Sequence, residues 1–392
     1  MAKIFSDHGS LHDSVLETPT CFPVETTRVL ADDRNPEFVS FSNNVTEAFR
    51  TNLDPESLHR MSSALQQEFI DQMHEAGVSM LPSMQHTLPS GCERGKILAI
   101  DVGGSTLRVS AVHLQGRSPT FTETLCRPTM RMTTFSSYSI DEKTRSLEGR
   151  QFFRWMAMKI RDSMDTNGQT LPKDTNMPMA LTWSFPMEQI NTYSGSMLPM
   201  GKGFHASEGL VGQDIGKLLE TACREEGLLL RTHAIVNDAT ATLMSKAFET
   251  GTTYTSLVMG TGINAAAFLP TSSLPSIKYG QREKQWMLDH KFVLVNTELS
   301  TFGAAIWPTT NWDRELMADL PSPEFQSLEY RAGGRYLGEI VRLVLLDAAN
   351  RGMIFNGKLP GGMQKPYSLD TSVIARFERS VTPSLTFDDQ YH

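Results

Sequence analysis

Alternating apolar and polar positions early in the chain predict a β-hairpin. Residues 97–100 form an apolar run that ends at Asp101, and every second residue over 107–111 is apolar again. This alternation is typical of strands. Gly103 and Gly104 stand between the two runs, and paired glycines at such a place favour a tight turn. We therefore expect two antiparallel strands joined by a glycine turn.

Apolar residues spaced three and four positions apart predict amphipathic helices. Asp54 followed by Pro55 is typical of a helix start, because aspartate can cap the helix and proline suits its first position. The apolar stripes are Met61, Leu65, Phe69 and Met73; Phe152, Met156, Ile160 and Met164; Val211, Ile215, Leu218 and Ala222; and Leu337, Ile340, Val341, Val344 and Leu345. Residues 240–248 are also expected to be helical.

Short apolar runs elsewhere predict further strands, and the order of the elements predicts an α/β fold. The expected strands cover residues 120–125, 179–183, 233–236, 256–259, 265–269 and 292–295. Two of them flank Gly260, Thr261 and Gly262, which makes a second hairpin with a glycine turn. Two such hairpins, each followed by mixed strands and helices, favour two similar α/β halves.

Polar residues gather where the predicted strands end, and ligands bind at strand ends in open α/β folds. These residues are Asp101, Ser184, Asn237, Asp238, Gly260, Thr261, Gly262, Asn296 and Glu298. Plain structural explanations exist for single members: Asp238 can cap the next helix, and Glu298 can be a solvated turn carboxylate. Lys202 can be an ordinary loop lysine. Together, however, they include every residue type that moving a phosphoryl group to an alcohol requires.

The first glycine turn has the chemistry of a phosphate site. Gly103 and Gly104 let backbone amides approach a phosphate closely, and Ser105 and Thr106 add hydroxyl donors. Asp101 at the strand end can hold a magnesium ion, directly or through water. An ordinary hairpin with a polar tip is the alternative, and spacing alone does not decide between the two.

Composition and charge narrow the class of protein. The 392 residues suffice for two domains, and a formal net charge of −8 argues against a nucleic-acid partner. No apolar run approaches the length of a membrane span, and the first 20 residues lack the apolar core of a secretory signal. We therefore expect a cytoplasmic protein. We expect reduced thiols at the four widely spaced cysteines, which are Cys21, Cys92, Cys126 and Cys223.

Six motifs, in order, resemble those of the eukaryotic hexokinase family, in its fungal hexokinase and glucokinase form. IDVGGSTLRV resembles the first phosphate motif, WSFPMEQINTYSGSMLPMGKGF the sugar-binding signature, and VNDATATLMS the segment with the catalytic aspartate. VMGTGINAAAF resembles a phosphate-contacting hairpin, VNTELSTFG a sugar-binding loop, and LEYRAGGRYLGEIVRLVLL the segment whose glutamate completes the sugar site. The resemblance implies an actin-like ATPase (ribonuclease H-like) α/β fold, with two domains around a cleft for sugar and ATP.

The domain organisation follows from the same resemblance. Residues 1–40, which are polar and aperiodic, are expected to be a flexible leader. Residues 41–95 would be the N-terminal helical part of the large domain, 96–236 the small domain, and 237–392 the rest of the large domain. Family chains continue further, into strands, helices and an adenosine motif. We therefore expect a truncated large domain, with most adenosine contacts missing and a sheet edge exposed.

The resemblance implies that the chain is an ATP-dependent hexose kinase that uses Mg²⁺, with glucose, fructose or mannose as its substrate. Asp238 would be the general base that takes the proton of the attacking hydroxyl, and Lys202 would stabilise charge. The implied substrate-binding residues are Ser184, Phe185, Pro186, Lys202, Asn237, Asp238, Asn264, Glu298 and Glu329. The implied nucleotide-binding residues are Asp101, Gly103, Gly104, Ser105, Thr106, Arg108, Gly260, Thr261 and Gly262, with Asp101 also at the metal.

Some residues depart from the family pattern. Gly201 stands where threonine is usual, which removes one hydrogen bond to the sugar, worth roughly 1 kcal/mol. Thr106 replaces an asparagine, Tyr330 a lysine, and Leu299 with Ser300 a Trp-Gly pair. A catalytically weak or inactive sugar-binding protein, with regulatory protein partners, is therefore the alternative. The retained acid–base and sugar residues favour the enzyme.

Overall fold

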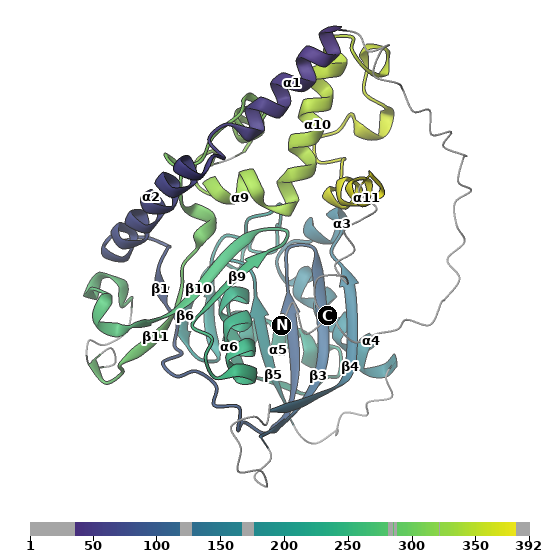
Figure 1. The fold of residues 1–392 in the computed structure, drawn as a ribbon. Coiled ribbons are helices and arrows are strands. Elements are labelled where there is room, and N and C mark those ends of the chain that lie inside the picture. Colours follow the sequence, from purple (N-terminus) through teal and green to yellow (C-terminus); the bar gives the residue numbers. More distant parts are fainter. Residues whose placement is uncertain are drawn as a thin grey trace. The chain divides into compact units, whose positions relative to one another are not determined.

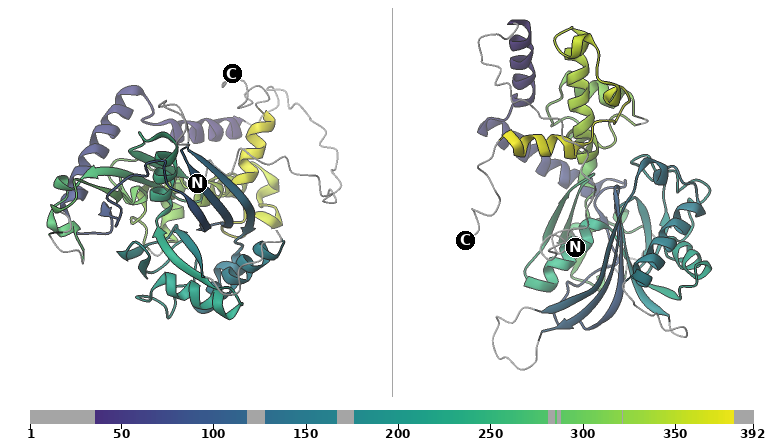
Figure 2. Two further views of the ribbon diagram at one scale, coloured as in Figure 1. Left: turned by 90° about the horizontal axis from the view of Figure 1, so that it is seen from below. Right: turned by 90° about the vertical axis from the view of Figure 1, so that its right-hand side faces the viewer.

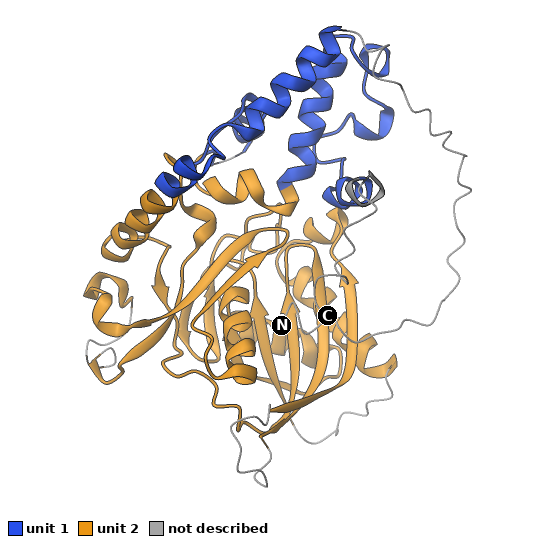
Figure 3. Cartoon of the chain, in the orientation of Figure 1, with its two compact units in different colours: residues 1–61, 307–323, 336–392 blue, residues 62–306, 324–335 orange. Residues whose placement is uncertain are grey.

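The chain forms two compact units in the computed structural model, which describes residues 36–117, 128–166, 176–280, 285, 288–320 and 322–381. One unit comprises residues 1–61, 307–323 and 336–392, and the other comprises 62–306 and 324–335 (Figure 3). Both predicted hairpins lie in the second unit, which we call the hairpin unit. The other is called the helical unit.

A five-stranded mixed sheet is the centre of the hairpin unit (Figure 1). Its order is β4 (Thr129–Ser139), β3 (Thr106–Gly116), β2 (Gly95–Val102), β5 (Met177–Trp183) and β8 (Leu230–Val236). The first three strands are antiparallel, whereas β5 lies parallel to both β2 and β8. Parallel pairing places the carboxyl ends of β2, β5 and β8 at the same edge of the sheet.

Two helices cover one face of this sheet, and the right-hand view of Figure 2 shows them together on one side. They are α4 (Arg150–Thr166) and α5 (Ile215–Glu225). The predicted stripe of α4 is confirmed, because Phe152, Met156 and Ile160 are fully buried in the core between helices and sheet. This burial is the main source of stability for this half.

A second, four-stranded sheet has the order β1 (Leu81–Pro82), β11 (Phe292–Asn296), β10 (Ile263–Pro270) and β9 (Thr255–Met259). All its strand pairs are antiparallel, so β9, β10 and β11 repeat the arrangement of β2, β3 and β4. The expected similarity of the two halves therefore holds for three strands. Among the described residues, β9 is an edge strand.

Helices also pack on the second sheet. In α6 (Asp238–Thr250), Ala239, Leu243 and Ala247 contact Ala266 and Leu294. Three of the four predicted stripe residues of α2 (Pro55–His74), namely Leu65, Phe69 and Met73, pack on another part of the sheet, beside Met80 and Val295. The unit is completed by α3 (Glu142–Arg145), α9 (Ser327–Ala332), the hairpin of β6 (Met187–Asn191) and β7 (Ser194–Met197), and the 3₁₀ turns η1 (Thr271–Ser273), η2 (Ser276–Lys278) and η3 (Leu299–Thr301).

The helical unit contains α1 (Pro36–Arg50), α8 (Asn311–Ala318), most of α10 (Gly334–Asn350), α11 (Thr371–Val381), η4 (Phe355–Gly357) and η5 (Gly361–Met363). Trp312 contacts the rings of Phe41 and Phe49, so α1 is held by a residue far along the chain. Arg342 and Glu339 form a buried ion pair at 2.6 Å. No helix among the described residues is long and apolar enough to cross a membrane.

The structure corrects two sequence predictions. Residues 36–40 belong to α1, so the predicted leader over 1–40 is wrong in its last five residues; the rest of it lies outside the described residues. Val211 is exposed and precedes α5, because Gly209 and Gly212 have left-handed φ angles of +71° and +83° that interrupt a helix. The helix begins only after Asp214 caps it.

Other predictions are incomplete or untested. The strand expected over 120–125 lies outside the described residues, and β4 was not predicted. Within the described chain, Cys92 and Cys223 are free thiols, as expected, and burial raises the pKa of Cys223 to about 12. The compact units do not follow the predicted boundary after residue 236, since both sides of it lie in the hairpin unit. That boundary stays a prediction.

Candidate active site

The first glycine turn joins β2 to β3, as predicted. The amide of Gly103 donates to the carbonyl of Thr106 at 3.0 Å, which closes the turn. A Cβ on Gly104 would lie 3.0 Å from Cγ2 of Thr261 and 3.3 Å from Cδ of Lys202. A larger residue at 104 would therefore crowd the side chains of Thr261 and Lys202, which come from two other segments of the site.

The second glycine turn joins β9 to β10 and is held by the start of α10. Gly260 donates to the carbonyl of Gly262 at 2.9 Å. Gly334 donates to the carbonyl of Gly260 at 2.8 Å, and Arg335 donates to that of Thr261 at 3.0 Å. A Cβ on Gly334 would lie 2.7 Å from the Gly260 oxygen, so only glycine permits this approach.

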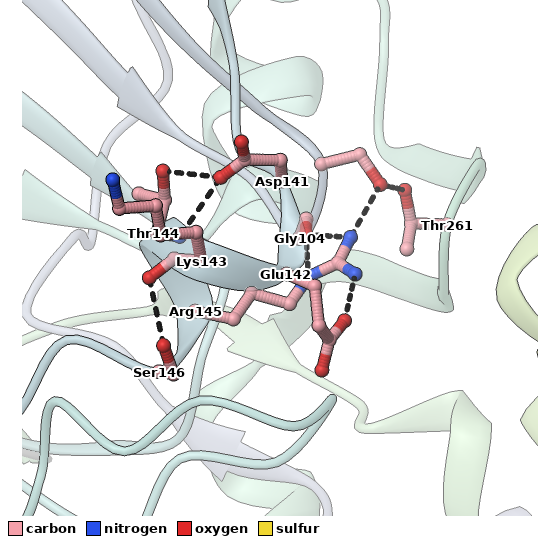
Figure 4. A network of polar contacts seen from close by, with 9 residues as sticks. Gly104, Asp141, Glu142, Lys143, Thr144, Arg145, Ser146 and Thr261 are labelled. Atoms are coloured by element: carbon pink, nitrogen blue, oxygen red, sulfur yellow. Dashed lines mark hydrogen bonds and ion pairs between the residues drawn. The ribbon is translucent and has the colours of Figure 1, made fainter.

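The two turns contact one another through their hydroxyl groups. Oγ of Ser105 lies 2.9 Å from Oγ1 of Thr261, and Figure 4 shows this contact beside the guanidinium of Arg145. These residues are 156 positions apart in the chain. The predicted nucleotide-binding residues of the two hairpins are thus brought together by the fold.

Lys202 reaches the same place from a loop between β7 and α5. Its backbone has a left-handed φ of 62°, and Nζ donates to the carbonyl of Ser184 at 3.3 Å. Nζ also lies 5.6 Å from the ring centroid of Phe185. Phe185 is buried among aromatic side chains, so it supports the Lys202 ammonium from the core side, whereas Pro186 is exposed.

Three asparagine side chains near the strand ends are linked to one another by hydrogen bonds. Nδ2 of Asn264 donates to Oδ1 of Asn237 at 3.2 Å and to Oδ1 of Asn296 at 2.9 Å. Nδ2 of Asn296 in turn donates to Oε1 of Glu298 at 2.7 Å. Asn296 was noticed as a strand-end residue but was not among the predicted site residues. Its place between Asn264 and Glu298 makes it part of the site.

Glu329 is the least exposed of the predicted site carboxylates, with only 2% of the residue exposed. Its Oε2 accepts from the amide of Ile263 at 3.0 Å, while Oε1 is buried without a hydrogen-bond partner in the described structure. Burial raises the pKa of Glu329, although the positive charge of Lys202 opposes the rise. A buried acceptor of this kind can accept a hydrogen bond from a hydroxyl group of a ligand.

Glu298 lies at the end of β11 in a left-handed backbone conformation, with φ 51° and ψ 47°. Burial raises its pKa to about 7, and the negative charges of Asp238 and Glu329 add to the rise. Hydrogen bonding by Asn296 and the charge of Lys202 work against it. The carboxyl group therefore changes its charge close to neutral pH.

Asp238 is the first residue of α6, and Asn237 caps that helix by accepting from the amide of Ala239 at 2.9 Å. Asn237 is thus the N-cap residue, and Oδ1 of Asp238 accepts from the same Ala239 amide at 2.8 Å, so Asp238 also supports the start of the helix. The Asp238 carboxylate is close enough to Asp101, Glu298 and Glu329 to raise the pKa of each. Four carboxylates and Lys202 therefore share one electrostatic neighbourhood.

Asp101 pairs with Arg108 across the first hairpin, with Oδ2 2.8 Å from Nη1. Burial raises the Asp101 pKa, and Arg108 partly offsets this. The described residues contain no group of three or more His, Cys, Asp or Glu side chains that could hold a metal by themselves. Asp101 as a metal ligand stays a prediction, as do the roles of the other predicted site residues.

Comparisons of the sequence and of the structure with known proteins point to the same family as the motifs do. The sequence pattern of the family described as Hexokinase matches residues 44–248 and again residues 254–390. The chain belongs to the hexokinase family. The resemblance inferred from the motifs is therefore confirmed.

Individual hexokinases are about 30% identical to the chain. Hexokinase-9 of Oryza sativa subsp. japonica is 30% identical over 296 residues, which make up 75% of this chain and 56% of that protein. The hexokinase of Schistosoma mansoni is 31% identical over 312 residues, 78% of this chain and 63% of that one. The chain thus spans less than two thirds of the length of these relatives.

Solved hexokinase structures are also similar. The hexokinase from Schistosoma mansoni complexed with glucose has a TM-score of 0.70 and 27% identity, over 88% of this chain and 74% of that one. A second hexokinase crystal structure has a TM-score of 0.60 and 25% identity, over 89% of this chain and 74% of that one. The predicted fold class, a mixed α/β fold of the actin-like ATPase kind, is confirmed.

Three features of this hexokinase-like site were not predicted from the sequence. Arg145 contacts the first turn, Asn296 joins the linked asparagine side chains, and the pair Gly333 and Gly334 lets α10 begin against the second turn. The Gly-Gly pair stands at the start of a strongly apolar helix and was a usable signal. Arg145 had none, because its partner is 41 residues away in sequence.

Proposed function

We propose that the chain is an ATP-dependent hexose kinase, which transfers the γ-phosphate of ATP to the 6-hydroxyl of a hexose such as glucose. The convergence of Asp238 with Glu298, Glu329 and Lys202 beside the two linked glycine turns carries the proposal. Membership of the hexokinase family supports it, as does the likeness to a hexokinase solved with glucose. Because the chain spans 56–63% of its relatives, its activity has to be measured on this chain.

Sugar hydroxyl groups would be held by Ser184, Asn237, Glu298 and Glu329. The free acceptor Oε1 of Glu329 supports this role, since a buried acceptor is costly unless a ligand donates to it. A site that pairs several hydroxyls rejects molecules that lack them. The choice among glucose, fructose and mannose is left to experiment.

Asp238 would act as the general base. It is the first residue of α6 and lies in the same electrostatic neighbourhood as Glu298 and Glu329. The neighbouring carboxylates of Glu298 and Glu329 would orient the sugar so that its 6-hydroxyl lies within reach of Asp238.

The phosphates of ATP would lie along Gly103, Gly104, Ser105, Thr106, Gly260, Thr261 and Gly262, with Lys202 and Arg108 supplying positive charge. In phosphoryl transfer, positioning and charge stabilisation supply most of the rate enhancement. The hydroxyl contact between Ser105 and Thr261 supports one continuous phosphate site formed by both turns.

A divalent cation, which we propose to be Mg²⁺, would accompany ATP. The residues fit such an ion, because Mg²⁺ is usually bound by one or two carboxylates together with substrate phosphates and water. Asp101 supplies one partly buried carboxylate near the first turn, and a three-ligand protein site is not required. When bound, the ion would neutralise charge on the transferring phosphate. The cytoplasmic location and the regulatory partners stay predictions.

The test is ATP-dependent formation of hexose 6-phosphate by the purified chain, with glucose, fructose and mannose assayed separately. Asp238→Asn keeps the shape of the side chain but removes the base, so we expect kcat to fall roughly 10²- to 10⁴-fold. The Kd for the sugar should change little. Asp319→Asn, at an exposed position, is the matched control. A folded wild-type chain that binds sugar without turnover would overturn the proposal and leave a sugar-binding protein.

A further inference from the structure

The guanidinium of Arg145 is bound to the backbone of the first glycine turn (Figure 4). Nε and Nη2 both donate to the carbonyl oxygen of Gly104, at 3.3 and 3.1 Å. The side chain is 14% exposed, and Nη1 also pairs with the exposed Glu142 at 3.2 Å. Two donors on one buried carbonyl leave that carbonyl little freedom to rotate.

Fixing this carbonyl also fixes the direction of a neighbouring amide. The carbonyl of Gly104 and the N–H of Ser105 belong to one planar peptide unit, and in a trans peptide they point in opposite directions. With the oxygen held toward Arg145, the N–H of Ser105 points away from it. Backbone N–H groups of glycine turns are the donors that hold phosphates.

Arg145 also acts on the Ser105 side chain. Its Nη2 lies 3.5 Å from Oγ of Ser105, and a guanidinium can only donate hydrogen bonds. Oγ of Ser105 is therefore the acceptor in this longer contact, and its own hydrogen is directed elsewhere. The nearest partner is Oγ1 of Thr261, at 2.9 Å, on the second turn.

A short helix holds Arg145 in position. Asp141 caps α3 by accepting from the amide and the hydroxyl of Thr144, at 2.8 and 2.7 Å. The carbonyl of Arg145 accepts from the amide of His205 at 3.0 Å, three residues after Lys202. The carbonyl of Ser105 accepts from the amide of Ile140 at 2.8 Å. Arg145 thereby links the first turn to the lysine loop.

Positive charge gathers around the two turns. Burial lowers the pKa of Arg145, and the nearby charge of Arg335 lowers it further, yet a guanidinium remains protonated. Arg335 lies beside the lysine loop, where a Cβ on Gly203 would be 3.1 Å from its Nη2. Two positive charges in one electrostatic neighbourhood favour a bound anion near them.

We propose that Arg145 is a positioning residue for nucleotide phosphates: it fixes the Gly104–Ser105 peptide so that the N–H of Ser105 faces the phosphate chain, and it leaves the Ser105 hydroxyl as the donor that joins the first turn to Thr261. The inference rests on the proposed function, because it names the residue that prepares the predicted phosphate turn. The inference depends on where the guanidinium places its two donors, and not only on its positive charge. A lysine at 145 would keep the charge but could not place two donors on one carbonyl.

The experiment compares Arg145→Gln, Arg145→Lys and Lys143→Gln with the wild type. Lys143 is exposed on the same helix, so Lys143→Gln repeats the loss of charge without touching the turn. Calorimetry gives the Kd for MgATP and, separately, for glucose, and steady-state kinetics gives KM for ATP and kcat. We expect Arg145→Gln to raise the Kd and the KM for ATP about tenfold or more, with the Kd for glucose within about twofold. Lys143→Gln should match the wild type.

Arg145→Lys separates geometry from charge. We expect it to lose at least about threefold in MgATP affinity, whereas full retention would show that charge alone suffices and would overturn the positioning role. Should Arg145→Gln fail to fold, Arg145→Lys decides the question by the same readout. A wild-type chain that binds no MgATP would overturn the proposed function itself. Unchanged MgATP binding in both Arg145 variants would overturn only the present inference.

Discussion

The carboxylate of Glu329 lies directly against the backbone of Gly262. Oε2 of Glu329 occupies the space that a Cβ on Gly262 would take, and its Cδ would be 2.9 Å from that Cβ. The same Oε2 accepts from the amide of Ile263 at 3.0 Å. A side chain at position 262 can therefore be accommodated only if the carboxylate of Glu329 moves away from the tip of the second hairpin.

Gly262→Ala should consequently disrupt the sugar site. The new methyl group must displace Glu329, and we expect the Kd for glucose, measured without nucleotide, to rise at least about tenfold. Gly260→Ala is the matched control, since a Cβ there meets nothing within 4 Å. Its Kd for glucose should stay within about twofold of the wild type. Equal effects of the two substitutions would refute the assignment of Glu329 to the sugar site.

Gly201→Thr should strengthen sugar binding. A Cβ at 201 meets nothing within 4 Å, so a larger side chain can be accommodated. The threonine hydroxyl would restore the hydrogen bond that the family pattern implies, and we expect about a fivefold lower Kd for glucose. Gly201→Val adds a side chain of the same shape without the hydroxyl. An equal gain from valine would show that backbone stiffening, rather than a hydrogen bond, is responsible.

Glu298→Gln should stabilise the sugar-free protein at high pH but not at low pH. Burial raises the folded-state pKa of Glu298 to about 7 from an ordinary value of 4.5. The folded chain thus keeps this proton where the unfolded chain has lost it, and ionisation costs stability as pH rises from 4.5 to 7. Glutamine removes that cost and still accepts from Asn296.

We expect the melting temperature of Glu298→Gln to exceed that of the wild type by about 2 to 6 °C at pH 8, corresponding to roughly 1 to 3 kcal/mol. The difference should shrink toward zero at pH 5. Glu324→Gln, at an exposed position, is the control and should show no difference at either pH. A gain for Glu298→Gln that is the same at pH 5 and pH 8 would contradict the raised pKa.

Leu257→Lys should reduce self-association. Within the described chain β9 is an edge strand, and its Leu257 and Met259 side chains are 54% and 68% exposed. Apolar edge strands pair with other chains, and an added lysine blocks such pairing. We expect the wild type, but not the variant, to gain apparent mass with concentration in light scattering. Tyr254→Lys, just outside β9, tests whether any added charge is enough.

Local pattern predicted much of the fold and many of the site residues. The hairpin of β2 and β3, the buried stripe of α4 and the strand β5 followed from apolar spacing, because period and glycine placement are properties of short segments. The motifs also identified Asp238 and Lys202, which the structure brings into one neighbourhood. These residues stand at strand ends or in loops that the sequence already marks.

Weak local patterns account for the errors. Most residues of β4 are exposed or half-buried, so its sequence lacks the apolar alternation that marks a strand. The stripe that included Val211 matched helical spacing, but two glycines in left-handed conformations end that match before Asp214. At 36–40, the helix is held by contacts of Phe41 and Phe49 with Trp312, about 270 positions away.

The sequence by itself thus determined the local elements, the glycine turns and the identity of the chemical groups, since each depends on neighbours within a few residues. Only the tertiary structure decided which groups meet: Ser105 with Thr261, Glu329 with Gly262, and Arg145 with Gly104. Such pairs join segments 41 to 156 residues apart in sequence. Their contact is a consequence of strand order and helix packing, which no local pattern contains.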